Sequence, residues 1–198
     1  MEQTKRQEAL FKVGMVISKI GEVVHWIGVV SMIVVLVMCI FASSSFLGFI
    51  DESMLFDANG GTTIEAYGFQ LDCADKDGNV NVKAIAVFSV AAFISLGLMA
   101  MVFRNIYLVL KSIIGKNGVK SSPFAKDNVR MIREIGIFSI SLPIIGLIMQ
   151  CVAILILGWE NVEAAVSLDG FIVGIIGLCL TQIFAYGASL QSDVDGLV

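Results

Sequence analysis

The chain has 198 residues, of which 57% are hydrophobic and only 15% are charged. This composition is typical of integral membrane proteins and argues against an ordinary soluble domain. The formal net charge is -4, and no basic patch with interleaved aromatic residues occurs, so we expect no direct binding to nucleic acid.

Four apolar stretches follow one another along the chain, and each can cross a membrane as a helix, for which about 20 residues suffice. We predict spans over residues 23–49, 84–114, 135–159 and 168–190. Residues 1–22 follow an amphipathic helical pattern, and residues 191–198 form a short cytoplasmic tail. The predicted fold is an all-α integral membrane protein. It is a single bundle of four transmembrane helices with a small extracellular loop or hairpin between the first and second.

Residues 51–82 form an acidic loop between the first two spans. Glycine-containing turn signals and an alternating pattern from Thr62 to Leu71 predict a short hairpin within it. Three aspartates are candidate contacts for an extracellular ligand: Asp72, Asp75 and Asp77. The spacing of Asp75, Asp77 and Asn79 is similar to a calcium loop, but no Glu stands at the twelfth position, which favours a solvated turn.

Residues 115–134 form a basic segment between the second and third spans. Ser122 is a candidate N-cap, and Pro123 fits the first helical position. Three basic residues follow at spacings of four and three and share one helical face: Lys126, Arg130 and Arg133. We predict a short helix at the cytoplasmic headgroups, before the chain turns into the bilayer, whose basic residues contact headgroups or a protein partner.

Charge segregation along the chain predicts its orientation. Residues 51–83 hold seven acidic and two basic residues, whereas residues 111–134 hold six basic and two acidic ones. Because short cytoplasmic loops are rich in Lys and Arg, both termini should be cytoplasmic and the acidic loop outside. The aromatic residues agree with this orientation, because Trp26, Tyr107 and Tyr186 lie at the predicted cytoplasmic ends of their spans, where such residues are enriched.

Three ionisable residues lie within or beside the apolar stretches: Glu22, His25 and Arg104. Glu22 and His25 stand three residues apart and therefore share a face. Intramembrane charges usually face a partner, so we expect a polar cluster in which Glu22 pairs with Arg104. Snorkelling of Arg104 to the headgroups is the alternative.

Small or polar residues recur along the first helical stretch at alternating steps of four and three: Gly14, Ser18, Gly21, His25 and Gly28. This pattern predicts a seam along which helices approach closely in lipid. Gly170, Gly174 and Gly177 predict a second close-packing face, either within the chain or between chains of a homo-oligomer.

The residues needed for most catalytic chemistries are missing from the sequence. One histidine is present, and the four cysteines have no metal or redox spacing. We expect Cys39, Cys151 and Cys179 to pack as small apolar residues, whereas Cys73 could pair between molecules. With no Ser-His-Asp set or phosphate-binding loop, we predict a non-enzymatic protein with no metal site, cofactor or catalytic residue.

Two stretches carry a resemblance to a known family. Residues 122–136, SPFAKDNVRMIREIG, and residues 186–198, YGASLQSDVDGLV, are similar to the YoaS-like family of four-span bacterial membrane proteins of unknown function. Many members carry a Glu in the tail, where this chain has Ser192 and Asp193. The resemblance implies the bacterial plasma membrane and a frequent genomic neighbour, a small Xre-type helix-turn-helix regulator. It implies no established activity.

Three functions follow as hypotheses. The first is a sensor or regulatory membrane protein that holds or releases a small cytoplasmic helix-turn-helix regulator. The second is an immunity or envelope-stress protein against membrane-active peptides, whose acidic loop attracts cationic peptides. The third is a small transporter subunit. Four spans are few for a transporter, and the sequence has no inverted repeat.

Overall fold

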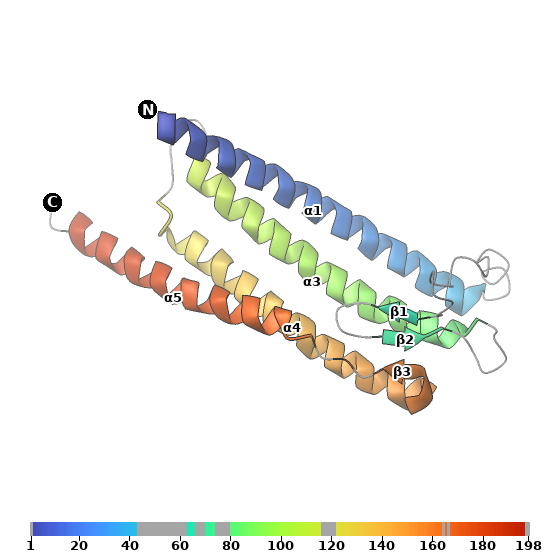
Figure 1. Cartoon of the computed structure of the whole chain (residues 1–198). Coiled ribbons are helices and arrows are strands. Elements are labelled where there is room, and N and C mark those ends of the chain that lie inside the picture. Colours follow the sequence, from blue (N-terminus) through green and yellow to red (C-terminus); the bar gives the residue numbers. More distant parts are fainter. Residues whose placement is uncertain are drawn as a thin grey trace. The chain divides into compact units, whose positions relative to one another are not determined.

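The computed structural model describes the following residues: 2–42, 63–65, 70–73, 80–115, 122–163, 165 and 167–196. Over this part of the chain, four long helices accompany three short strands and one 3-10 helix (Figure 1). The elements are, in order, α1 (Glu2–Phe41), β1 (Thr63–Glu65), β2 (Gln70–Asp72), α3 (Val82–Ile114), α4 (Lys126–Leu157), η2 (Trp159–Asn161), β3 (Val162–Glu163) and α5 (Asp169–Asp195).

The chain divides into two compact units. The first unit comprises Met1–His25, Leu98–Ser141 and Asp169–Val198. The second comprises Trp26–Gly97 and Leu142–Leu168. Helices α1, α3 and α4 therefore contribute one part to each unit, whereas α5 belongs to the first unit and the sheet to the second.

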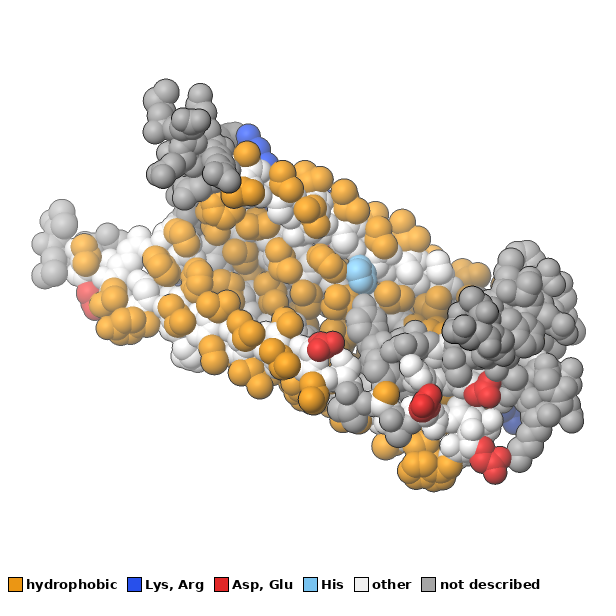
Figure 2. Space-filling model, in the orientation of Figure 1, with side chains coloured by type: hydrophobic (Ala, Val, Ile, Leu, Met, Phe, Trp, Pro, Cys, Tyr) orange, Lys and Arg blue, Asp and Glu red, His pale blue; other side chains and the backbone are white. Residues whose placement is uncertain are grey.

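Four helices in the described part are long and apolar enough to cross a membrane: Glu8–Phe41, Val82–Ile114, Lys126–Leu157 and Asp169–Val194. Large apolar side chains stand exposed along them, and Figure 2 shows such side chains over most of the helical surface in view. In a soluble protein so much exposed apolar surface would be a liability, whereas lipid tails accommodate it. These features indicate a multi-pass membrane protein and agree with the predicted set of four apolar helices.

Helix α1 differs from the predicted boundaries of the first span. Helix α1 is unbroken from Glu2 to Phe41, so the amphipathic pattern and the first apolar stretch form one helix. Its predicted end at residue 49 lies outside the described residues, and the helix itself ends at Phe41. Helix α3 (Val82–Ile114) nearly coincides with the predicted second span.

Helix α4 differs from the prediction of a separate headgroup helix over residues 115–134. It is continuous from Lys126 to Leu157, because nothing in the sequence breaks the helical pattern between the basic and apolar parts. Ser122 does not cap it. Instead, residues 122–125 form a turn in which the N–H of Phe124 donates to Ser122 Oγ (3.2 Å) and the N–H of Ala125 to the Ser122 carbonyl (3.0 Å). Similarly, α5 continues to Asp195 through most of the predicted tail.

In the first unit, α1 and α3 pack along the glycine seam. A Cβ atom at Gly21 would lie 2.7 Å from Cδ1 of Phe103, so only glycine fits without a shift. Ser18 Oγ donates to the Gly14 carbonyl at 2.8 Å, and His25 Nδ1–H donates to the Gly21 carbonyl at 2.7 Å. The polar members of the seam are thus satisfied within their own helix, and its role as a packing surface is confirmed.

Glycines also set the contact between α4 and α5. A Cβ at Gly136 would lie 3.0 Å from the backbone N of Leu178, and one at Gly177 would lie 3.1 Å from Cα of Gly136. The close-packing face predicted at Gly174 and Gly177 is therefore used within the chain. Small residues at such crossings let backbones approach closely, which is how helices gain packing energy in lipid.

In the second unit, the three strands form an antiparallel sheet in the order β1-β2-β3 (Figure 1). Leu71 at its centre pairs with Ile64 on one side and Val162 on the other. Leu71 and Val162 are buried against side chains of α3 and α4: Val87, Ala91, Met149 and Ala153. Gln150 of α4 also donates to the Glu163 carbonyl at 3.2 Å. Strand β3 has two residues and was too short to be predicted.

Candidate interaction surfaces

The three basic residues of α4 form an exposed surface in the first unit. Lys126, Arg130 and Arg133 are all exposed, and we call them the basic face. On the same helical turns Asn128 is fully buried, so this part of α4 has one side packed and one side open. Because the residues stand on a long helix rather than in a loop, their spacing is fixed by the helix.

The carboxylate of Glu134 links Arg130 of the basic face to helix α3. Arg130 Nε lies 3.5 Å from Oε1 of Glu134, one helical turn along α4. The other oxygen of Glu134 accepts a hydrogen bond of 3.1 Å from Asn105 Nδ2, and Asn105 is buried on α3. Sequence reasoning missed both Asn105 and Glu134, because the pair is 29 residues apart and neither residue belongs to a motif.

The turn before α4 is tied to the end of α5. Ser122 Oγ donates to Gln191 Oε1 at 2.6 Å, and the rings of Phe124 and Phe184 pack with centroids 5.5 Å apart. A hollow of about 480 Å³ lies here, lined mainly by apolar groups of Ser122, Pro123, Phe124, Gly187, Leu190, Gln191 and Val194. The basic segment and the chain end, which the sequence singled out separately, thus share one surface.

Asn128 holds this turn in position. Its Nδ2 donates to the carbonyls of Ser122 (3.2 Å) and Pro123 (3.5 Å), while its Oδ1 accepts no hydrogen bond from the described residues. A buried amide that binds two turn carbonyls replaces the water they would otherwise need. Asn128 therefore fixes where the chain enters α4.

No hydrogen bond or ion pair joins any two of the three residues of the predicted polar cluster, Glu22, His25 and Arg104, all of which the structure describes. Glu22 is buried, and its Oε2 lies 2.8 Å from Lys19 Nζ, so its partner is Lys19 and not Arg104. Lys19 is three residues away on the same helix and reaches Glu22 without crossing to α3. The ring of His25 packs on Phe103 with centroids 5.0 Å apart. Arg104 is exposed, as the snorkelling alternative requires.

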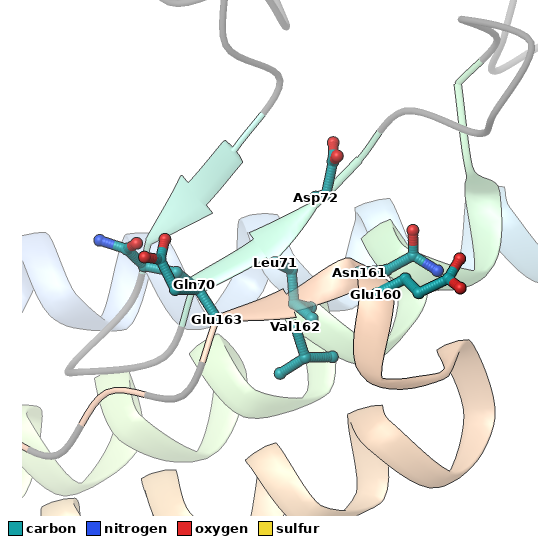
Figure 3. A pocket seen from close by; sticks show the side chains of 7 residues that line it. All are labelled: Gln70, Leu71, Asp72, Glu160, Asn161, Val162 and Glu163. Carbon is teal, nitrogen blue, oxygen red and sulfur yellow. The ribbon is translucent and has the colours of Figure 1, made fainter.

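An acidic pocket lies on the sheet of the second unit. It has a volume of about 320 Å³ and is lined by Gln70, Leu71, Asp72, Glu160, Asn161, Val162 and Glu163 (Figure 3). In Figure 3, Leu71 and Val162 point toward the helices, while the polar side chains stand around them at the rim. Of the predicted outer-loop contacts, Asp72 belongs to this pocket, and Asp75 and Asp77 lie outside the described residues.

Cys73 lies directly after β2 and is 1% exposed. It packs with Cys39, Ala84 and Ile85, and it is a free thiol. Burial, and to a smaller extent the neighbouring Asp72 carboxylate, raises the pKa of the Cys73 thiol from 9.0 to about 12. The expected pairing of Cys73 between two molecules therefore conflicts with its position, because burial suppresses both access to the thiol and formation of the thiolate.

The described residues contain no group of three His, Cys, Asp or Glu side chains arranged to hold a metal ion. Comparisons of the chain with family models, with curated proteins and with solved structures found no match. The surfaces themselves are thus the basis for a function: an exposed basic face beside an apolar hollow, and an acidic pocket on a small sheet.

Proposed function

We propose that this is a non-enzymatic, multi-pass protein of the bacterial plasma membrane that acts as a sensor or regulator. In this proposal its basic end is cytoplasmic and holds a small helix-turn-helix regulator. The observation that carries the proposal is the exposed basic face beside the apolar hollow on the turn and α5. The resemblance to YoaS-like proteins, whose genomic neighbour is often such a regulator, gives the partner its chemical class.

The surface suits a folded protein partner. Interfaces combine a desolvated apolar anchor with a charged rim that sets orientation and association rate. Here the hollow at Phe124 and Leu190 offers the apolar site, and Lys126 and Arg130 offer the rim. A partner with a protruding apolar side chain ringed by carboxylates would match both parts.

Binding is tested by purifying the full-length protein in mild detergent with the regulator encoded beside its gene. We expect association that is lost when Lys126, Arg130 and Arg133 are all changed to Gln. Lys83→Gln serves as control, because Lys83 is an exposed lysine in the first turn of α3, in the second unit. A regulator that binds the triple variant as tightly as the wild type, or never binds, would contradict the proposal.

The orientation is tested separately by cysteine labelling in whole cells, after the four native cysteines have been replaced. Trp159→Cys, at a position 73% exposed after α4, should react with a membrane-impermeant maleimide in intact cells. Ser192→Cys, exposed near the end of α5, should react only after permeabilisation. The reverse pattern would place the basic end outside and rule out a cytoplasmic regulator.

A second function, protection against cationic membrane-active peptides, is favoured by one observation. The acidic pocket gathers three carboxylates, those of Asp72, Glu160 and Glu163, on a sheet that we propose to be extracellular. Deletion of the gene should then raise sensitivity to such peptides, and Asp72→Asn with Glu163→Gln should mimic the deletion. If the double variant protects cells as well as the wild type, the pocket has no such role.

A further inference from the structure

A second basic cluster, separate from the basic face, lies between α1 and α3 in the first unit. Lys19 Nζ lies 5.1 Å from the centroid of the Tyr107 ring, and Lys111 Nζ lies 5.3 Å from the same centroid. Each ammonium group is attracted to the ring, and together they gather two positive charges around it. Such an arrangement favours a negative group nearby.

The described residues supply only part of that negative charge. Glu22 Oε2 lies 2.8 Å from Lys19 Nζ and is engaged there. In the described part of the chain, no carboxylate is paired with Lys111, which stands in the last turn of α3. Lys111 is exposed and can therefore meet an anion from outside the protein.

A third lysine lies at the level of Lys111. A Cβ at Gly14 would be 3.2 Å from Cδ1 of Leu110, so the end of α3 is level with the turn of α1 that contains Lys12 and Val13. Lys12 is exposed on that turn. Lys12 and Lys19 are two turns apart on one face, with Val16 between them.

The lengths of the helices put this cluster at headgroup depth. Helix α1 has 40 residues, which corresponds to about 60 Å, whereas the hydrocarbon core is about 30 Å thick. The turns around Lys12 and Lys19 can therefore extend beyond the core. Tyr107 fits the same level, since tyrosine is enriched where hydrocarbon meets headgroups.

We propose that this cluster binds an anionic glycerophospholipid. Lys19 and Lys111 bind the phosphate beside Tyr107, and the acyl chains extend from there into the hydrocarbon core. Lysine clusters at this depth attract anionic lipids. The inference rests on the membrane location alone and not on the helix-turn-helix partner.

The test compares melting temperatures of the full-length protein in detergent with added phosphatidylglycerol, phosphatidylcholine or inorganic phosphate. We expect phosphatidylglycerol to raise the melting temperature more than phosphatidylcholine, and phosphate alone to have no effect. Lys111→Gln should remove about half of that phosphatidylglycerol increment, since two lysines share the headgroup. Lys83→Gln removes the same charge from the first turn of the same helix and should leave the increment unchanged.

Two further results separate this site from a general charge effect. Tyr107→Phe keeps the ring and should keep the increment, whereas Tyr107→Leu should reduce it. The proposal is overturned if phosphatidylcholine stabilises the protein equally, if phosphate alone reproduces the shift, or if Lys83→Gln acts like Lys111→Gln. Because each variant is compared with itself across lipids, a change in its basal stability does not affect the outcome.

Discussion

The close approach of α4 and α5 makes a quantitative prediction for Gly174→Ala. A Cβ at Gly174 would lie 2.8 Å from the carbonyl oxygen of Gly136 and 3.0 Å from the backbone N of Ile140. Both atoms belong to the α4 backbone, so the clash cannot be relieved by a side-chain rotation and the two helices must separate. Overpacking of this kind costs about 1–3 kcal/mol.

Gly97→Ala is the matched control, because no atom lies within 4 Å of a Cβ built at Gly97 in α3. Both substitutions replace a helical glycine by alanine and so share the same gain in helix propensity, about 1 kcal/mol. The difference between the variants is then the packing term alone. It corresponds to a melting temperature about 2–12 °C lower for Gly174→Ala than for Gly97→Ala.

Thermal unfolding in detergent, followed by the loss of helical circular dichroism, measures this difference. Helices of both units contribute to that signal, so it reports on α4 and α5 around Gly174 as well as on α3 around Gly97. If Gly174→Ala melts at or above the temperature of Gly97→Ala, α4 and α5 do not approach as closely as described.

Three further predictions concern single side chains. The raised pKa of Cys73 favours the neutral thiol in the folded protein, so the contribution of this thiol to stability should be constant below pH 9 and decline as the pH rises toward 12. In Cys73→Ala, the melting temperature should therefore fall less steeply between pH 9 and pH 12 than in the wild type, and an equal fall would refute this prediction. Glu22→Gln leaves Lys19 without its carboxylate beside a buried site and should lower the melting temperature more than Glu2→Gln does, so equal shifts would show that the ion pair contributes nothing. Asn128→Asp replaces the donor facing two carbonyls by an acceptor and should destabilise the protein by about 1–3 kcal/mol in the same assay, whereas a neutral result would mean that the turn before α4 is held otherwise.

The sequence was most informative where a pattern repeats along one helix. The four apolar stretches, the glycine seam and the shared face of Lys126, Arg130 and Arg133 all follow from helical periodicity and were found in the structure. The helix ends were less predictable. Ser122 and Pro123 have the chemistry of a helix start, but their backbone groups are instead used in a turn that Asn128 completes from inside the helix.

Pairings between distant segments could not be derived from one sequence. Glu22 has Lys19 one turn away on its own helix and Arg104 on another helix, and the choice between them depends on which way each side chain points from its helix. Strand β3 and the acidic pocket depend on two residues after α4 that pair with β2 almost a hundred positions earlier. No local propensity identifies a strand so short, because its stability comes from Leu71 and the helices beneath it.

The unbroken helices change how the charged residues can act. A headgroup helix joined to the bilayer by a turn could tilt independently, whereas Lys126 and Arg130 stand on the first turns of a helix that also carries Gln150. Gln150 is bonded to the backbone of β3, so one helix links the basic face to the edge of the acidic pocket through its own backbone. Pro143 lies between them and removes one hydrogen bond of that helix, which makes it the position where a bend requires the least energy. A bend of α4 between the basic face and the sheet is therefore expected first at Pro143.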